Sequence, residues 1–454
     1  MNLNPHIFRE YDIRGVAGRD LTEETAERIG RAIGTFQQDR GRRRITLGRD
    51  CRLSSPALHD AFLAGALATG LDVIDVGVCP TPLLYFSIRH HGADGGVMIT
   101  GSHNPAEDNG FKVCVGPDTI HGKDIRRLLE IAESGAFRSG KGAVEDRTIV
   151  PEYQDFVASN VRLARSLRVV VDGGNGTGGV VAAPLLRRMG VEVVELYCDM
   201  DGRFPNHHPD PTVEENTADL RRAVLERRAD VGIAYDGDAD RIGVIDDLGR
   251  TIWGDMLLVV LAREVLSRRP GAVIISEVKA SQILYDEIAA RGGRPIMWKT
   301  GHSLIKEKMK EEGAALAGEV SGHIFFADRW FGFDDAIYAS CRLLEILAAS
   351  DQPLSAMLAD LPPTHATPEI RVPCPDDEKF RLVGRLRDRL PEIAPGARVI
   401  DVDGVRAVFP DGWGLVRASN TGPVLVLRFE ARTPERLQAL RELFEGAIRE
   451  LRER

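Results

Sequence analysis

Short apolar runs alternate with amphipathic stretches along most of the 454-residue chain. The β-branched run at 44–48, for example, is followed by a helical pattern at 55–68 and by a second apolar run at 73–76. Apolar strands separated by amphipathic helices are typical of α/β domains whose sheets are largely parallel. The pattern therefore predicts an α/β fold.

One unit, an apolar strand followed by a polar loop and a helical stretch, begins three times, at 45–50, 169–174 and 273–278. Any α/β protein contains such units, so the repetition is only a weak indication of three related domains. We place these three domains at 1–148, 149–250 and 251–362.

The composition changes after Asp360. The segment 361–368 contains three prolines and predicts a linker. Beyond it, helical patterns at 380–390 and 434–452 flank short strand-like runs. These features predict a smaller α+β domain over 363–454.

The chain carries 59 Lys and Arg against 68 Asp and Glu, a formal charge of −9. This balance disfavours binding to nucleic acid or to an anionic membrane through the overall field. No apolar run approaches the ~18 residues of a membrane-spanning helix, and the first ten residues show no signal peptide. The six cysteines are scattered without a metal or disulfide spacing, so we expect a cytoplasmic protein. We also expect a monomer.

The most specific motif is Asp-Gly-Asp-Ala-Asp-Arg at 236–241, directly after the apolar run at 230–234. In an extended loop, side chains alternate with a period of two, so the three carboxylates are expected to point the same way. Crowded carboxylates repel one another unless a cation lies among them, and oxygen ligands suit Mg²⁺. An EF-hand is excluded because Arg241 stands where that motif needs glycine. We favour a metal site over a solvated acidic turn.

A second motif, Thr-Gly-Ser-His-Asn-Pro at 100–105, follows the strand-like run at 96–99. Open α/β sheets bind ligands at the carboxyl ends of their strands, so Ser102 is a candidate for chemistry. An ordinary turn explains the same residues, and by itself this explanation is preferred. A hydrolase elbow is unfavourable because the G-x-S-x-G frame is absent.

Two further loops carry polar groups. Gly-Glu-Val-Ser-Gly-His at 318–323 places Glu319 and Ser321 on one side of an extended segment, where both could hold sugar hydroxyls. Arg-Ala-Ser-Asn-Thr-Gly-Pro at 417–423 gathers several donors and turn amides between two strands, which suits a phosphate. Simple turns remain equally good explanations of both segments.

The glycine run at 174–179 fits G-x-G-x-x-G after a strand, and Glu195 lies where a ribose-binding acid is expected. It therefore keeps a dinucleotide site open as an alternative. Glycine-rich turns between strand and helix are common, so we give this alternative little weight.

Taken together, the motifs resemble those of the α-D-phosphohexomutase superfamily along the whole chain. The matches, in chain order, are Tyr-Asp-Ile-Arg-Gly at 11–15, the loops at 100–105 and 236–241, Lys-Thr-Gly-His-Ser at 299–303, and the segments 318–323 and 417–423. Within the superfamily the sequence is most similar to the bacterial phosphomannomutase/phosphoglucomutase group. The phosphate loop of phosphoglucosamine mutases more often resembles Arg-Pro-Ser-Gly-Thr-Glu-Pro, which lowers that alternative without excluding it.

The resemblance implies three related α/β domains with mixed sheets and a smaller C-terminal α+β domain around a central cleft. It also implies interconversion of hexose 1-phosphate and hexose 6-phosphate, with mannose or glucose as the sugar. A phosphoserine at Ser102 would give its phosphate to the substrate, and the hexose 1,6-bisphosphate intermediate would turn and return the other phosphate. Glucose 1,6-bisphosphate would also act as an activator.

The resemblance assigns residues to each task. The expected Mg²⁺ ligands are the phosphate on Ser102 together with Asp236, Asp238 and Asp240. The residues expected to take part in catalysis are Ser102, Arg14, His103, Lys112, Arg241 and His323. Those expected to bind substrate are Tyr11, Lys279, His302, Glu319, Ser321, Arg417, Ser419, Asn420 and Thr421.

Three alternatives stay open from sequence. A phosphoglucosamine mutase shares most of the motifs. The hypothesis of a nicotinamide-dependent oxidoreductase depends on the glycine run at 174–179. A non-catalytic phosphosugar-binding protein would need the donors at 417–423 but neither Ser102 nor the aspartates.

Overall fold

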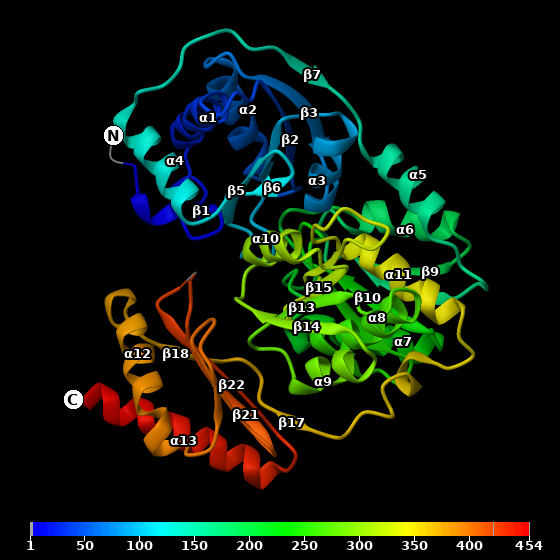
Figure 1. Cartoon of the computed structure of the whole chain (residues 1–454). Coiled ribbons are helices and arrows are strands. Elements are labelled where there is room, and N and C mark those ends of the chain that lie inside the picture. Colours follow the sequence, from blue (N-terminus) through cyan, green and yellow to red (C-terminus); the bar gives the residue numbers. More distant parts are fainter. Residues whose placement is uncertain (1–2, 421, 454) are drawn as a thin grey trace.

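The computed structural model describes residues 3–420 and 422–453, which form four β-sheets with their own helices (Figure 1). The first sheet has the strand order β1-β5-β4-β2-β3-β7, with β6 beside β5. Strands β4, β2 and β3 are parallel, whereas β5 and β1 are antiparallel additions at one edge. The elements of this part are β1 (Ile13–Val16), α1 (Glu23–Gln38), β2 (Arg44–Arg49), α2 (Ser55–Leu67), β3 (Asp72–Val78), α3 (Thr81–His90), β4 (Gly95–Ile99), β5 (Asp108–Val115), β6 (Asp118–Thr119), α4 (Lys123–Ser134) and β7 (Val144–Asp146).

The second and third sheets are also mixed, with the orders β12-β11-β10-β8-β9 and β14-β13-β15-β16. The second part contains α5 (Val150–Asn160), β8 (Arg168–Asp172), α6 (Gly179–Arg188), β9 (Glu192–Leu196), α7 (Ala218–Arg227), β10 (Val231–Tyr235), β11 (Ile242–Asp246) and β12 (Thr251–Ile252). The third contains α8 (Gly254–Arg268), β13 (Val273–Glu277), α9 (Gln282–Ala290), β14 (Arg294–Trp298), α10 (His302–Glu312), β15 (Leu316–Gly318), β16 (Ile324–Phe326) and α11 (Ala336–Ala348).

The fourth sheet differs because all of its strand pairs are antiparallel. Its order is β17-β22-β21-β20-β19, with β18 also paired to β22. Its elements are β17 (His365–Ala366), β18 (Ile370–Pro373), α12 (Asp376–Ile393), β19 (Arg398–Ile400), β20 (Val405–Phe409), β21 (Gly412–Ala418), β22 (Val424–Ala431) and α13 (Pro434–Glu453). The expected arrangement, three α/β domains with mixed sheets and a smaller α+β domain, is confirmed.

Local sequence explains where these elements begin. Thr22 caps α1 by accepting a hydrogen bond from the amide of Thr25, and Glu23 and Glu24 favour the positive end of that helix. Strand β10 is buried along its whole length, as expected for the middle of a mixed sheet. Among the described residues, no helix combines the length and apolar composition that crossing a membrane requires.

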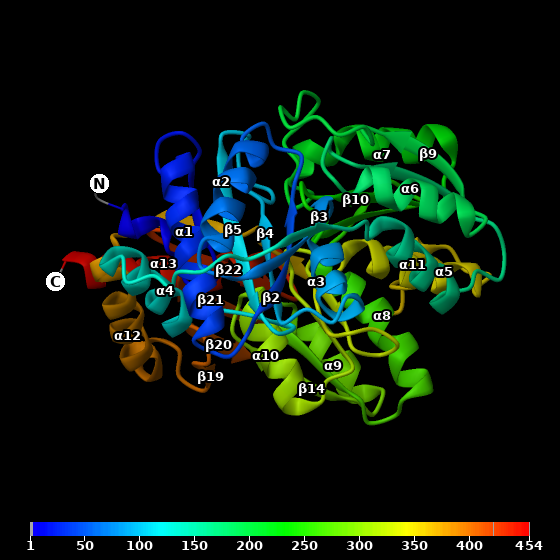
Figure 2. The same ribbon diagram turned by 90° about the horizontal axis from the view of Figure 1, so that it is seen from above.

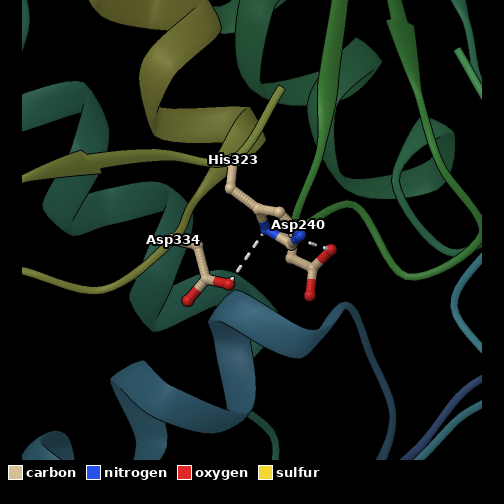
Figure 3. A group of neighbouring side chains, drawn as sticks. All are labelled: Asp240, His323 and Asp334. Atoms are coloured by element: carbon tan, nitrogen blue, oxygen red, sulfur yellow. Dashed lines mark ion pairs between the residues drawn. The ribbon is translucent and has the colours of Figure 1, made fainter. Parts of the chain in front are cut away.

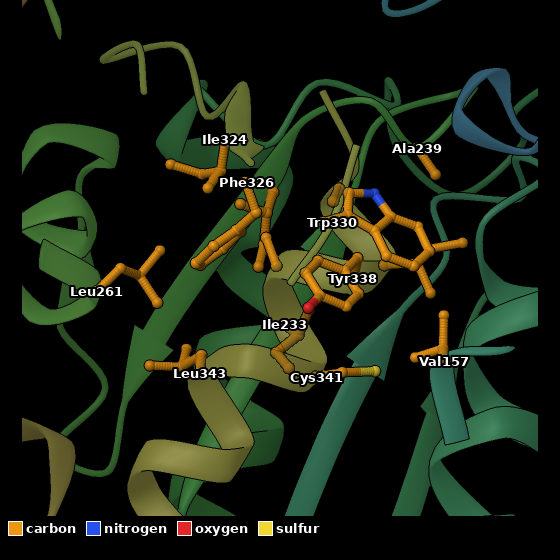
Figure 4. Close-up of a cluster of buried hydrophobic side chains, with 14 of the residues drawn as sticks. Val157, Ile233, Ala239, Leu261, Ile324, Phe326, Trp330, Tyr338, Cys341 and Leu343 are labelled. Carbon is orange, nitrogen blue, oxygen red and sulfur yellow. The ribbon is translucent and has the colours of Figure 1, made fainter. Parts of the chain in front are cut away.

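One hydrophobic core continues from α3 through the second and third sheets, so the first three domains are joined by apolar contact. At its centre the rings of Trp330 and Tyr338 stack 4.0 Å apart, and Val157 of α5 and Ile233 of β10 lie in the same cluster (Figure 4). A second core lies between the first sheet and helices α1, α2 and α4.

The fourth domain has a separate core built on α12, α13 and its sheet. It meets the third domain through one small apolar cluster, Val278 with Trp413 and Leu415, and through polar bonds. Arg406 donates to the carbonyl of Val278 at 2.6 Å, and Arg428 donates to that of Lys279 at 2.6 Å. In the view from above (Figure 2), α12 and α13 lie on the side of the molecule opposite α5 and α11.

Candidate active site

Ser102 lies just beyond β4, in the loop at the carboxyl end of that strand. Its backbone is left-handed, with φ 49°, which is uncommon for a residue with a side chain. The Ser102 amide donates to Thr100 Oγ1 at 2.8 Å, and its hydroxyl donates to Asp236 Oδ2 at 2.7 Å. The structure therefore brings the serine loop of the first domain against the aspartate loop of the second.

The aspartate loop forms a tight turn, so the expectation of an extended loop is wrong. Ala239 has φ 57°, and its amide donates to the carbonyl of Asp236 at 3.1 Å. The turn still gathers the carboxylates, because one oxygen each of Asp236, Asp238 and Asp240 lies within 4.8 Å of the others. All three side chains are buried.

The glycine run at 174–179 supports this turn. A Cβ on Gly176 would lie 2.6 Å from the carbonyl oxygen of Gly237, and the amide of Thr177 donates to that oxygen at 3.0 Å. Glu195, the expected ribose-binding acid, forms an ion pair with Arg187 instead. The glycines thus allow close packing against the aspartate loop, and the dinucleotide interpretation is not favoured.

Lys112 of β5 lies among the carboxylates. Its ammonium contacts Asp238 Oδ2 at 2.7 Å and Asp240 Oδ2 at 2.5 Å. Burial opposes its charge, but the two carboxylates raise the pKa of Lys112 above its usual value. Thr81, at the start of α3, also donates its hydroxyl to Asp238.

The donor set fits a hard divalent cation. The second oxygens of Asp238 and Asp240 are buried and have no hydrogen-bond partner among the described residues. Burial and the charges of the other two aspartates raise the pKa of Asp236 well above its usual value. Carboxylate oxygens placed in this way suit Mg²⁺.

A second group adjoins the trio, formed by His323, Asp334 and Asp240 (Figure 3). His323 Nδ1 lies 3.1 Å from Asp334 Oδ2 and 3.7 Å from Asp240 Oδ1. The other ring nitrogen, Nε2, accepts a hydrogen bond from Arg241 Nε at 3.0 Å. Because Nε2 is an acceptor here, the proton of a neutral ring belongs on Nδ1, facing the carboxylates.

Asp334 also binds Lys306 of α10, whose ammonium lies 2.9 Å from Asp334 Oδ1. Burial opposes ionisation of Asp334, but Lys306 and the neighbouring histidines hold its pKa well below the usual range. The carboxylate is therefore a fixed negative charge that orients the His323 ring.

The remaining cationic and imidazole candidates surround the serine. His103 Nδ1 lies 3.3 Å from Ser102 Oγ, while Arg14 bonds Asp12 at 2.6 Å and Asn104 at 3.0 Å. Burial, together with Arg241 and Arg14, lowers the pKa of His103 well below its usual value. His302, at the start of α10, also has a lowered pKa because of burial and the charge of Lys306.

The loop at 319–322 is a turn, since the amide of Gly322 donates to the carbonyl of Glu319 at 3.0 Å. The expectation that Glu319 and Ser321 alternate along an extended segment is therefore wrong. Glu319 is buried and accepts from the amide of Gly301 at 2.7 Å, whereas Ser321 is half-buried. The turn brings Glu319 close to the start of α10.

Tyr11 connects three domains. Its hydroxyl donates to the carbonyl of Thr300 at 2.9 Å and accepts from Asn420 Nδ2 at 2.7 Å. The positive φ of Gly301, 131°, and its contact with the Tyr11 ring leave no room for a Cβ. The hydrogen bonds of this single phenol hold the first, third and fourth domains together.

The expected phosphate loop connects β21 and β22. Arg417 Nε contacts Asp403 Oδ2 at 3.0 Å, and the Ser419 hydroxyl accepts from the amide of Gly422 at 3.2 Å. Lys279 lies close enough to Arg417 for the two positive charges to oppose each other, and it pairs with Glu369 at 3.0 Å. Thr421 lies outside the described residues.

Four polar residues of the site were not expected from sequence: Thr81, Lys306, Asp334 and Asp403. Asp334 is followed by Asp335, which caps α11, so a carboxylate pair before a helical stretch was the only available signal. The other three are isolated polar residues with no informative spacing, and only tertiary packing places them here.

A buried serine facing an acidic trio, between two α/β domains, is suited to phosphoryl transfer assisted by a metal ion. Models of the phosphoglucomutase/phosphomannomutase domains match this chain in order. Alpha/beta/alpha domain I matches residues 5–138, domain II 151–249, domain III 253–365 and the C-terminal domain 369–447.

Similar proteins agree with this match. The chain is 48% identical over 443 residues to a phosphomannomutase/phosphoglucomutase of Pseudomonas aeruginosa, covering 98% of this chain and 95% of that protein. It is 46% identical over 450 residues to a phosphoglucomutase of Neisseria meningitidis, covering 98% and 97%. A crystal structure of a phosphoglucomutase/phosphomannomutase family protein from Burkholderia thailandensis matches with a TM-score of 0.94 and 43% identity, over 99% of this chain and 98% of that one. The chain belongs to the phosphoglucomutase/phosphomannomutase family.

Proposed function

We propose that this enzyme interconverts the 1-phosphate and 6-phosphate of glucose and mannose through a phosphoserine at position 102. The observation that carries the proposal is the 2.7 Å contact between Ser102 Oγ and Asp236 Oδ2, inside a buried acidic trio. The names of the relatives support both sugars. The family match supports a mutase over a binding protein or an oxidoreductase.

In the first transfer, the bond between phosphorus and Ser102 Oγ breaks while a substrate hydroxyl oxygen bonds to phosphorus. The proton of that hydroxyl passes to a base, and the serine oxygen regains a proton. After the bisphosphate turns over, the same events run in the opposite direction and restore the phosphoserine. Phosphoryl transfer of this kind depends mainly on alignment and charge stabilisation.

Asp236, Asp238, Asp240 and the phosphate on Ser102 would hold Mg²⁺, which supplies positive charge to the phosphoryl oxygens when it is bound. Arg241 and Lys112 add fixed positive charge on either side of the trio. Lys112 pairs with two of the carboxylates, and Arg241 keeps the His323 ring oriented.

The imidazoles of His103 and His323 are the groups that transfer protons. His103 has a nitrogen 3.3 Å from Ser102 Oγ, and His323 is fixed between Arg241 and Asp334. We assign His103 and His323 as the proton acceptor and donor of the two half-reactions. Arg14, bonded to Asn104, steadies the serine loop against the transferring group.

The distant phosphate must be held in the same way in both poses of the intermediate. Arg417, Lys279, Ser419 and Asn420 supply this grip, together with Thr421. Glu319 and Ser321 hold sugar hydroxyls, with His302 and Tyr11 lining the same region. We assign the domains as 1–148, 149–250, 251–362 and 363–454, with β12 completing the second sheet across the second boundary.

The test replaces the phosphoryl carrier. Ser102→Ala should lower turnover of glucose 1-phosphate by several orders of magnitude in a coupled assay with Mg²⁺ and glucose 1,6-bisphosphate. Ser134→Ala is the matched control, because its hydroxyl bonds only local backbone groups, the carbonyl of Ile131 and the amide of Ala136. Near-normal activity of Ser102→Ala would defeat the proposal.

The same assay with mannose 1-phosphate and glucosamine 1-phosphate defines the substrate. We expect comparable turnover of the glucose and mannose phosphates. A clear preference for the amino sugar would replace the proposed substrate, and saturable binding without turnover would identify a binding protein.

A further inference from the structure

Arg52 lies beneath the serine loop and is not one of the site residues described so far. It is 1% exposed and follows β2 in the loop that leads to α2. All five of its N–H donors are used, four of them on backbone carbonyls of the segment 102–108. Nε donates to Asp50 Oδ2 at 3.1 Å. Nη1 donates to the carbonyls of Pro105 and Asp108, the second at 2.9 Å. Nη2 donates to the carbonyls of Ser102 and Asn104, each at 2.7 Å.

Asp50 extends this contact to the other side of the serine. Its Oδ2 accepts from the amide of Gly101 at 3.2 Å, and its Oδ1 accepts from the amide of Arg52 at 3.0 Å. The Ser55 hydroxyl donates to the same Oδ1 at 2.5 Å. The pair of Asp50 and Arg52 therefore binds the loop before and after Ser102.

The loop is also shaped to admit the guanidinium. A Cβ on Gly101 would lie 2.5 Å from Arg52 Cζ, so the space that a side chain would occupy is filled by the planar group. Phe204 of the second domain covers Arg52, with its ring centre 5.1 Å from Cζ. Arg52 thus lies where the domain that carries the serine meets the domain that carries the aspartates.

We propose that Arg52 is a positioning residue for phosphoryl transfer, an inference that rests on the proposed function. It holds Ser102 in the left-handed conformation, φ 49°, that directs Oγ to Asp236. A planar group with five donors binds four converging carbonyls at once, which the three donors of a lysine ammonium do not. Arg52 acts through the backbone, and none of its hydrogen bonds goes to a residue assigned to the sugar or to its distant phosphate.

The expected defect lies in alignment of the serine. Misplacement of a reacting group by about 1 Å costs about 100-fold in rate. We expect Arg52→Met to lower kcat by about that factor while KM changes by less than about threefold. The rate at which glucose 1,6-bisphosphate phosphorylates Ser102, followed by intact mass, should fall by the same factor per folded molecule.

Arg342→Met is the matched control, since Arg342 is equally buried and donates several hydrogen bonds within the third domain. We expect it to lower the melting temperature without changing the rate per folded molecule. If Arg52→Met keeps its phosphorylation rate within about threefold of wild type, the inference is wrong. If wild type itself lacks mutase activity, the proposed function fails instead.

A second route tests the same contact if Arg52→Met does not fold. Gly101→Ala displaces the guanidinium from the other side, so it should also lower the phosphorylation rate. A phosphorylation rate of Gly101→Ala within about threefold of wild type would overturn the inference. Where Arg52→Met does fold, the two changes are combined: the added methyl group then has no guanidinium to displace, so Gly101→Ala should cost little more. Full additivity of the two changes would show that Gly101 and Arg52 act independently and would overturn the inference.

Discussion

Gly237 of the aspartate loop packs against the serine loop, and its replacement by alanine is the sharpest test of how the two loops are aligned. An added Cβ would lie 2.4 Å from the carbonyl oxygen of Ser102. The backbone of Gly237 does not have a positive φ, so alanine adopts it without strain. The effect of Gly237→Ala is therefore purely a matter of distance between the loops.

The size of the effect follows from that distance. Ordinary contact of a Cβ begins near 3.4 Å, so the loops must separate by about 1 Å. The 2.7 Å hydrogen bond between Ser102 and Asp236 does not survive such a shift. Because misplacement by about 1 Å costs about 100-fold, kcat should fall by about two orders of magnitude. Overpacking should also lower the free energy of unfolding by about 1–3 kcal/mol.

The assay couples formation of glucose 6-phosphate to a dehydrogenase, at saturating Mg²⁺ and glucose 1,6-bisphosphate. Gly384→Ala is the matched control, because Gly384 lies in α12 and nothing is within 4 Å of the added Cβ. In this helix, alanine should raise stability by about 0.8–1 kcal/mol and leave kcat unchanged. Melting curves of both variants separate loss of alignment from loss of folded protein.

A value of kcat for Gly237→Ala within about threefold of wild type would refute the reasoning. It would mean that the contact between these two loops does not set the geometry of transfer. A fall in kcat that is matched by the same fall in folded fraction would refute it as well.

Three further predictions concern other contacts. Tyr11→Phe removes the hydroxyl that bonds Thr300 and Asn420, so kcat/KM should fall about tenfold, measured in the same coupled assay. Asp240→Asn should raise the Mg²⁺ concentration needed for half-maximal activity by at least about tenfold, measured by titration after chelator treatment, and an unchanged value would argue against a metal ligand. Burial opposes the charge of His59, but hydrogen bonds with Asp75 and Asp60 raise its pKa in the folded protein. The protonated His59 therefore stabilises the fold fully below about pH 6.5, and this contribution is lost as the pH rises through the folded-state pKa. His59→Gln should therefore lower the melting temperature by about 2–4 °C at pH 5.5 and by less at pH 9, and equal shifts at both would contradict this sign.

The sequence was informative where chemistry is concentrated in a short segment. The aspartate loop contains its three carboxylates within five residues, so a metal site was predicted there from local pattern. The serine loop by itself was better explained as an ordinary turn, and only the resemblance gave Ser102 a role. The predicted strands at 44–48 and 96–99 lie within β2 and β4. Strands and short acidic loops depend on residues that are adjacent along the chain, and a single sequence shows these residues directly.

Other features depend on segments that are distant in sequence. The turn of the aspartate loop is set by Gly176 packing on Gly237, about sixty residues away. Arg52 lies about fifty residues before the carbonyls it binds, and nothing in its local sequence distinguishes it from a surface arginine. The function of the glycine run at 174–179 was ambiguous, because close backbone packing and dinucleotide binding both require glycines at these positions.

The self-contained core of the fourth domain has a consequence for turnover. Its junction with the third domain includes hydrogen bonds donated by Arg406 and Arg428, and its apolar part is the small cluster around Val278, Trp413 and Leu415. Water can replace such bonds at little net loss of free energy, whereas parting the first three domains would wet a large hydrocarbon surface. Parting the fourth domain from the third therefore costs less apolar contact than parting the first three domains from one another, and it leaves Ser102 and the acidic trio in register.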